Sequence, residues 1–161
     1  MSDVNFIDGH RLGAAFVANQ VRRLVDLIGE QGNDMLEAAG ITFPSRTVST
    51  VLFVGEHQPA STADIARALE QPHQVATQRV DLLIQLGIFE RVDDPDDGRR
   101  KLLCLTSEGS DQLKVLTERL EKAGHAFDAL FAEIGCDLAD VTRRATDALH
   151  KAPLLARMKA L

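Results

Sequence analysis

The spacing of hydrophobic residues predicts helices at both ends of the chain. From His10 to about Glu30, and again after Ser107, apolar residues recur three or four positions apart, which places them on one face of a helix. A third stripe continues until Pro153, which interrupts a helix. The stripe after Ser107 is so long that another helix, of this chain or of a partner, must cover it. The three stripes consist of Val17, Val21, Leu24 and Ile28; of Leu113, Leu116, Leu120, Ala123, Phe127, Leu130 and Ile134; and of Leu138, Val141, Ala145 and Ala148.

The middle of the chain predicts shorter elements. The stretch Gln31–Phe43 contains Gly32 and Gly40, which favours a short helix between loops. Pro44 is tolerated in a first helical turn and predicts a helix that ends near Gly55. Because no repeat or Gly/Ser linker divides the sequence, we expect one domain over residues 1–161.

Two short helices and a hairpin follow in the order of a winged helix-turn-helix. Ser61–Asp64 (STAD) has the spacing of a capping box, with aspartate in place of the usual glutamate, and predicts a helix start. After a break at Glu70 and Gln71, Pro72 predicts a second helix that runs to about Leu86.

The predicted wing is formed by two extended runs, Ile88–Val92 and Lys101–Thr106, on either side of the turn-forming residues Asp93–Arg100. The predicted fold class is therefore mainly α with a small β-hairpin wing, a winged helix-turn-helix flanked by N- and C-terminal helices.

The composition is that of an ordinary globular domain. Of the 161 residues, 45% are apolar and 26% are charged, and a chain of this length buries about 70% of its unfolded surface without disulfides or a structural metal. Cys104 and Cys136 form no CxxC, which excludes a disulfide scaffold and a four-cysteine zinc site. Asp3 and Asp8 stand where a signal peptide has lysine, and no apolar run is long enough to span a membrane. We therefore expect a cytoplasmic protein without a membrane partner.

Motifs for catalysis are absent from the sequence. It contains no G-x-S-x-G, H-E-x-x-H, P-loop or G-x-G-x-x-G, so we expect neither an enzyme nor a cofactor. The four carboxylates within Asp93–Asp97 lack the spacing of a calcium loop, so we predict no metal site.

Two motifs beside the wing resemble one known family. Asp94–Arg99 (DPDDGR) resembles the wing signature D-P-x-D-x-R of the MarR-type bacterial transcriptional regulators, and Leu105–Gly109 (LTSEG) resembles the L-T-x-x-G that opens their long dimerisation helix. Further positions fall at the family's spacing, namely Ile41-Thr42, Ile65-Ala66, Leu69, Val80-Asp81, Leu83 and Gly87.

The resemblance implies a homodimer that binds a pseudo-palindromic operator in double-stranded DNA. It further implies repression, relieved when a small-molecule effector binds between the dimer region and the DNA-binding lobe. Residues 44–106 would form the winged-helix lobe, and residues 8–30 and 107–161 the helical dimerisation region. The chain departs from the family at Pro72, where serine is frequent, and at Gln78, where many members have arginine.

The second short helix supplies the candidate base-reading residues. Ala76, Val80 and Leu83 share one face and should pack on the preceding helix. The opposite face presents His73, Gln74, Thr77, Gln78 and Asp81, with Arg79 at its boundary. Glutamine pairs with the major-groove edge of adenine, threonine offers a hydroxyl or a methyl group, and arginine suits a phosphate. The alternative is a polar face that is merely solvated.

The wing supplies the remaining DNA-binding candidates. Arg99 and Arg100 follow Gly98 at the tip, where a guanidinium can enter the narrow minor groove, and the resemblance favours Arg99 as the inserted residue. The residues expected to shape the wing are Asp94, Pro95, Asp97 and Gly98.

Charge argues against DNA binding at first sight. The net charge is −6, and even residues 71–100 hold four arginines against six acidic residues. We therefore expect weak non-specific binding, in which each arginine that faces DNA has a large effect. Two alternatives stay open, a redox-sensing regulator that uses Cys104 or Cys136 and a degenerate winged helix that binds only proteins.

Overall fold

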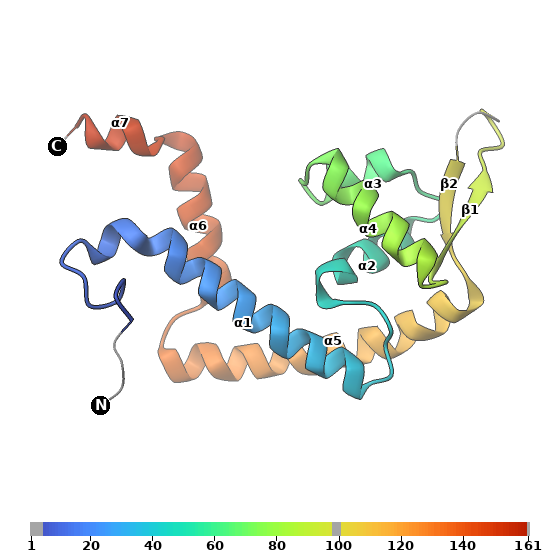
Figure 1. Cartoon of the computed structure of the whole chain (residues 1–161), viewed down its shortest axis with the longest axis horizontal. Helices are drawn as coiled ribbons and strands as arrows, with labels where there is room; N and C mark the ends of the chain where they lie inside the picture. The colour runs from blue at the N-terminus through green and yellow to red at the C-terminus, as the bar shows by residue number, and fades with distance from the viewer. Residues whose placement is uncertain (1–4, 98–100, 161) are drawn as a thin grey trace. The chain divides into compact units, whose positions relative to one another are not determined.

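The computed structural model describes residues 5–97 and 101–160. The chain forms two compact units, Met1–Arg119 and Leu120–Leu161 (Figure 1). The first unit contains the elements from the N-terminus through the first half of helix α5, and the second contains the remaining helices. In the described part of the chain, no helix is both long and apolar enough to cross a membrane.

Helix α1 (Val17–Ala38) follows a short 3-10 helix, η1 (Gly13–Phe16), and is longer than predicted. The break expected after Gln31 does not occur. Ser45 approaches the helix closely at Gly29, whose carbonyl accepts a hydrogen bond from Ser45 Oγ at 2.9 Å. At Gly32, an added Cβ would lie 3.3 Å from Ser45 Cβ. Glycine therefore serves here as a packing residue, and α1 continues to the left-handed Gly40, with φ of 74°.

The segment before α1 is tied to that helix by Asp8. Its carboxylate accepts hydrogen bonds from Arg23 at 2.6 Å and from Gln20 at 3.3 Å. The Arg23 guanidinium, followed by the Gln20 amide, lowers the pKa of Asp8, and the same contact raises the pKa of Arg23. Both groups are exposed, so the pair orders the N-terminal segment without adding much to stability.

The winged-helix elements begin with η2 (Ser45–Thr47) and α2 (Val48–His57). Helix α3 (Thr62–Ala68) and helix α4 (His73–Gln85) then form the helix-turn-helix. Their shared core lies between these helices and the wing. Its most deeply buried members are Val51, Val54, Ile65, Ala76, Val80, Leu83, Ile88, Phe89, Leu103 and Leu116.

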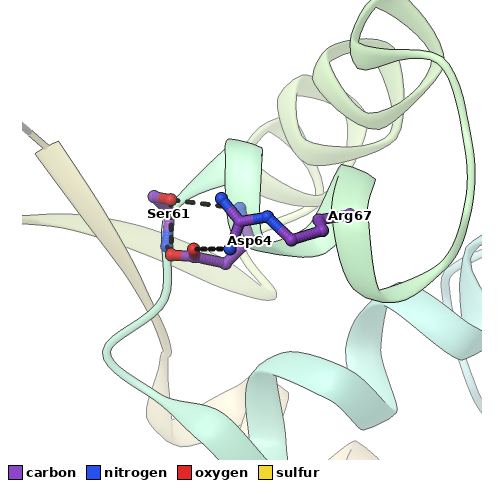
Figure 2. Close-up of polar contacts among 3 residues, drawn as sticks. All are labelled: Ser61, Asp64 and Arg67. Atoms are coloured by element: carbon purple, nitrogen blue, oxygen red, sulfur yellow. Dashed lines mark hydrogen bonds and ion pairs between the residues drawn. The ribbon is translucent and has the colours of Figure 1, made fainter.

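The predicted capping box begins α3 (Figure 2). Ser61 Oγ accepts a hydrogen bond from the Asp64 N–H at 3.2 Å, and Asp64 Oδ2 accepts one from the Ser61 N–H at 3.1 Å. Aspartate thus completes the box in place of glutamate. Arg67 Nη1 also donates to Asp64 Oδ1 at 3.3 Å, so the Asp64 carboxylate interacts with both the N-cap residue and the last turn of this short helix.

The wing is an antiparallel hairpin, as predicted. Strand β1 (Phe89–Asp93) pairs with β2 (Lys101–Leu105), with Phe89 opposite Leu105 at the base. Ala60 forms an isolated bridge with Leu103 on the other side of β2. The hairpin is therefore anchored to the segment that precedes α3.

Helix α5 (Ser107–Ile134) is fixed to the wing through its first turn. Thr106 Oγ1 donates to the Gly87 carbonyl at 2.6 Å and accepts from the Gly109 N–H at 2.9 Å. The Thr106 N–H donates to the Ile88 carbonyl at 3.0 Å. A Cβ at Gly109 would clash with that same Ile88 oxygen. The L-T-x-x-G motif therefore has a packing reason for both its threonine and its glycine.

The second unit contains the remainder of α5, α6 (Leu138–Lys151) and α7 (Leu154–Met158). Gly135, with φ of 65°, ends α5, and the Asp137 carboxylate caps α6 by accepting the Asp140 N–H at 2.9 Å. Arg157 of α7 donates to the carbonyls of Ala148 and Ala152 at the end of α6. These contacts confirm the predicted turn between two helices and the interruption at Pro153.

Several apolar side chains of the terminal helices are exposed. On α1, Val17 and Val21 are 56% and 50% exposed, and Leu24 and Ile28 are each 38% exposed. The exposed apolar residues of α6 and α7 are Val141, Leu149, Leu154, Leu155 and Met158. An exposed apolar stripe such as that of α1 is typical of an interaction site.

Candidate nucleic-acid interface

Helix α4 has one buried and one polar face, as predicted. Ala76, Val80 and Leu83 are at most 1% exposed. Helix α4 packs against α3 and α2, which hold it by its inner side. On the outer side, His73, Gln74 and Gln78 are exposed and Thr77 is half-buried. Their donors and acceptors are therefore available at the N-terminal half of the helix.

The Thr77 hydroxyl already uses its proton in a hydrogen bond within α4. It donates to the His73 carbonyl one turn earlier, at 2.9 Å, and lies 3.4 Å from the His73 ring nitrogen Nδ1. With its proton engaged in this way, the oxygen can only accept. In a major groove, Thr77 therefore suits the amino group of adenine or cytosine, or the thymine methyl group through its own methyl.

Arg79 does not extend freely into solvent. Its Nη1 donates to Gln71 Oε1, in the turn before α4, at 2.6 Å. The side chain is half-buried, at the edge of the polar face where the sequence placed it. This contact links the turn before α4 to a residue about two helical turns into that helix.

Two ion pairs engage other charges near this surface. Arg91 of β1 pairs with Asp81 of α4 at 2.9 Å, and Lys101 pairs with Asp93 at the end of the hairpin next to the wing tip. All four side chains are at least half exposed. The charges of Arg91 and Lys101 are therefore partly neutralised by neighbouring carboxylates of the described lobe.

The structure describes the wing as far as Asp97. The Asp94 carboxylate accepts the Asp96 N–H at 3.0 Å, a local turn that begins the tip. Pro95 and Asp97 are exposed. Gly98, Arg99 and Arg100 lie outside the described residues. Within residues 5–97 and 101–160, no group of three or more His, Cys, Asp or Glu is arranged to hold a metal ion.

The two cysteines are free thiols in different units. Cys104 lies in β2 opposite Glu90 and is half-buried, less deeply than Leu103 and Leu105 beside it. Cys136 is also half-buried, in the turn after α5. Its backbone N–H donates to the Phe131 carbonyl.

A surface hollow of about 400 Å³ lies where the second half of α1 meets η2. Asp26 and Glu30 of α1 and Arg46 of η2 line it, together with Val25 and Asn33. Asn33 Oδ1 accepts the Ser45 N–H at 2.8 Å, so this wall is fixed by the contact between the two elements. The hollow offers charges of both signs to a small polar molecule.

Comparison with known proteins identifies the helix-turn-helix and wing. A MarR family model matches residues 39–100, the segment from the end of α1 to the wing tip. This segment is similar to the winged helix-turn-helix of the MarR family. Over 96 residues, the chain is 33% identical to the HTH-type transcriptional regulator PrsX of Escherichia coli. That match covers 60% of this chain and only 55% of PrsX, so the chain spans about half of the length of this relative.

Solved structures share the MarR-family fold. One is the MepR–DNA complex of S. aureus, with a TM-score of 0.67 and 18% identity, covering 83% of this chain and 96% of that one. Another is PcaV of Streptomyces coelicolor in complex with its natural ligand, with a TM-score of 0.60 and 21% identity, covering 92% and 99%. At these identities the likeness establishes the fold class predicted from the sequence.

Gln71 is the residue of this surface that sequence reasoning missed. It was interpreted only as part of the break between two helices. Its proximity to Arg79 depends on the path of the turn, and a separation of eight positions carries no periodic signal for such a contact. A polar residue directly before Pro72 at a helix start was the sole available indication.

Proposed function

We propose that this chain is a DNA-binding transcriptional regulator. The polar face at the N-terminal half of α4 carries the proposal. Gln74, Thr77 and Gln78 lie there on a helix whose opposite face is fully buried. In helix-turn-helix proteins, the N-terminal residues of the second helix contact base edges in the major groove. Two amides and a hydroxyl suit that role, and His73 lies beside them at the start of the helix.

Phosphate and minor-groove contacts complete the proposed interface. Arg79 is assigned to a DNA phosphate, and Arg99 and Arg100 to the minor groove beside the wing. Asp94, Pro95, Asp97 and Gly98 are assigned to the shape of the wing. Because the lobe has few free cations, the affinity for random DNA should be low, and the loss of one arginine should have a large relative effect.

The regulator is proposed to act as a homodimer on a pseudo-palindromic operator. The exposed apolar stripe of α1 supports this, because water contact with Val17, Val21, Leu24 and Ile28 is unfavourable in an isolated protomer. A two-fold dimer would present two copies of α4 to successive major grooves. Residues 8–30 and 107–161 are proposed as the dimerisation region, and residues 44–106 as the DNA-binding lobe.

Repression relieved by a small-molecule effector is the proposed mode of regulation. The hollow between α1 and η2 supports an effector site, since it lies where a terminal helix meets the DNA-binding lobe. A ligand acts on such an equilibrium only as far as it binds one conformation better than the other. With Asp26, Glu30 and Arg46 in its walls, the hollow suits a polar or zwitterionic molecule.

Fluorescence anisotropy tests the DNA-binding proposal. The full chain is titrated into a labelled duplex from upstream of its own gene, and into a scrambled duplex of equal length, between about 50 and 200 mM salt. We expect preference for the first duplex and a loss of about 1–3 kcal/mol on Gln78→Ala. Gln85→Ala is the matched control, because Gln85 is exposed at the far end of the same helix. Equal affinity for both duplexes would contradict sequence-specific binding, and no binding to either would favour a protein-binding winged helix.

Sedimentation velocity tests the dimer. Leu24→Glu places a charge on the apolar stripe and should give monomers at concentrations where the wild type is dimeric. Asn19→Glu adds the same charge to α1 away from the stripe and should leave the dimer intact. If both variants sediment as the wild type does, the α1 stripe is not the dimer interface.

A further inference from the structure

The turn between α3 and α4 fixes the backbone of Gln71, through hydrogen bonds to the end of α3 before it and through Pro72 after it. The Gln71 N–H donates to the Ala66 carbonyl at 3.0 Å, and the Glu70 N–H donates to the Arg67 carbonyl at 3.3 Å. With Glu70 in the left-handed region at φ of 48°, these bonds form a Schellman motif at the end of α3. Pro72 follows, with φ of −55°, which its ring fixes. The position of Gln71 is thus set before its side chain makes any contact.

The side chain of Gln71 is satisfied at only one end. Its Oε1 accepts the short hydrogen bond from Arg79, whereas its Nε2 is buried without a hydrogen-bond partner among the described residues. The orientation of the amide follows from chemistry, because a guanidinium can only donate and must face the oxygen. A buried amide NH2 group without a hydrogen-bond acceptor is unfavourable compared with an apolar group of the same shape. Stability alone would therefore favour a residue such as methionine at this position.

We propose that Gln71 is a positioning residue that orients the Arg79 guanidinium toward a phosphate of bound DNA. The inference rests on the proposed function of DNA binding. Arg79 has five N–H donors, and the contact with Gln71 uses one, which leaves the others for a phosphate oxygen. The amide is neutral, so it holds the guanidinium without cancelling its charge, as a carboxylate at the same place would.

Pre-ordering matters more here than in a strongly basic protein. Binding through a free arginine loses the rotamer entropy of a long side chain, and a side chain already held in place loses less. Arg91 is paired with Asp81 and Lys101 with Asp93, so neither replaces Arg79 without breaking an ion pair. In this lobe, affinity therefore depends on how well the few available cations are placed.

Gln71→Met is the decisive variant, because it keeps the side-chain volume and removes the acceptor. We expect unchanged or higher thermal stability together with a Kd for the upstream duplex that is about three- to tenfold weaker. The salt dependence should keep its slope, because Arg79 still carries its charge. Arg79→Ala should instead lower the slope of log K against log salt by about 0.9. In the Arg79→Ala background, Gln71→Met should have no further effect, and Gln85→Met controls for the substitution itself.

Each alternative outcome contradicts the inference in a recognisable way. If Gln71→Met binds DNA as tightly as the wild type, or more tightly, Gln71 does not orient Arg79 for binding. If Gln71→Met weakens binding equally with and without Arg79, its role is structural. If the wild type binds but Arg79→Ala leaves the salt slope unchanged, Arg79 contacts no phosphate, while the proposed function stands. If the wild type shows no DNA binding, both the proposed function and this inference fail.

Discussion

Replacing Ser61 by alanine should weaken the helix-turn-helix by a predictable amount. Ser61 is 6% exposed, and its Oγ accepts the Asp64 N–H in the first turn of α3. The substitution leaves that N–H without its partner, whereas the bond from the Ser61 N–H to Asp64 remains possible. Loss of a serine cap costs about 1 kcal/mol, and up to about 2 kcal/mol at a buried site. Because α3 has only seven residues, little else in the helix can compensate.

Thermal and urea unfolding measure this effect. At about 2–4 °C per kcal/mol for a chain of this size, Ser61→Ala should lower Tm by roughly 3–6 °C. Protomer concentration must be held fixed, because the stability of a dimer depends on it. Ser61→Thr keeps the hydroxyl, so its Tm should fall much less than that of Ser61→Ala. Ser49→Ala, at an exposed position of α2, should change stability by less than about 0.5 kcal/mol.

The reasoning would be refuted if Ser61→Ala and Ser49→Ala gave the same unfolding curves. The capping box would then contribute nothing beyond an exposed serine. If Ser61→Thr lost as much stability as Ser61→Ala, the capping argument would also be contradicted, because the hydroxyl would then not be the group that stabilises α3.

Four further predictions follow from local geometry. Gly109→Ala should destabilise by about 3 kcal/mol or more in urea unfolding, because its Cβ meets the Ile88 carbonyl; Gly124→Ala, on the same helix with open space around it, should be neutral or stabilising. Glu70→Gly should raise stability by about 1 kcal/mol, since glycine adopts the left-handed conformation without strain; an unchanged Tm would contradict this. The Asp8 pair stabilises the N-terminal segment above the unfolded pKa of 3.8 and is lost as pH falls through the lower folded pKa; carboxyl NMR should show Arg23→Gln returning that pKa toward 3.8. Peroxide should affect DNA binding equally in wild type, Cys104→Ser and Cys136→Ser; selective protection by one substitution would favour the redox alternative.

Local signals were sufficient for most elements of the fold. The capping box at Ser61, the proline before α4 and the turn-forming residues of the wing each act within a few positions, so the sequence contains their full cause. The helix-turn-helix, the hairpin and the start of α5 were predicted to within a residue or two for that reason. The faces of α4 followed from helical periodicity, and the burial of Ala76, Val80 and Leu83 confirms them.

Contacts between distant segments explain what the sequence did not show. Gly32 was interpreted as a helix breaker, and only the approach of Ser45 reveals why glycine stands inside α1. The hydrogen bond between Gln71 and Arg79 likewise requires the path of the turn. Periodicity also identified the apolar stripe of α1 without indicating that it is exposed within a protomer.

The first turn of α5 is attached to the segment that joins α4 to the wing. Thr106 and Gly109 bind that turn to Gly87 and Ile88, the residues that join α4 to the wing. These hydrogen bonds fix the beginning of α5 to the segment that follows the C-terminal end of α4. In the dimer that we propose, we therefore expect a change in the spacing of the two α4 helices to originate in the part of α5 beyond its first turn.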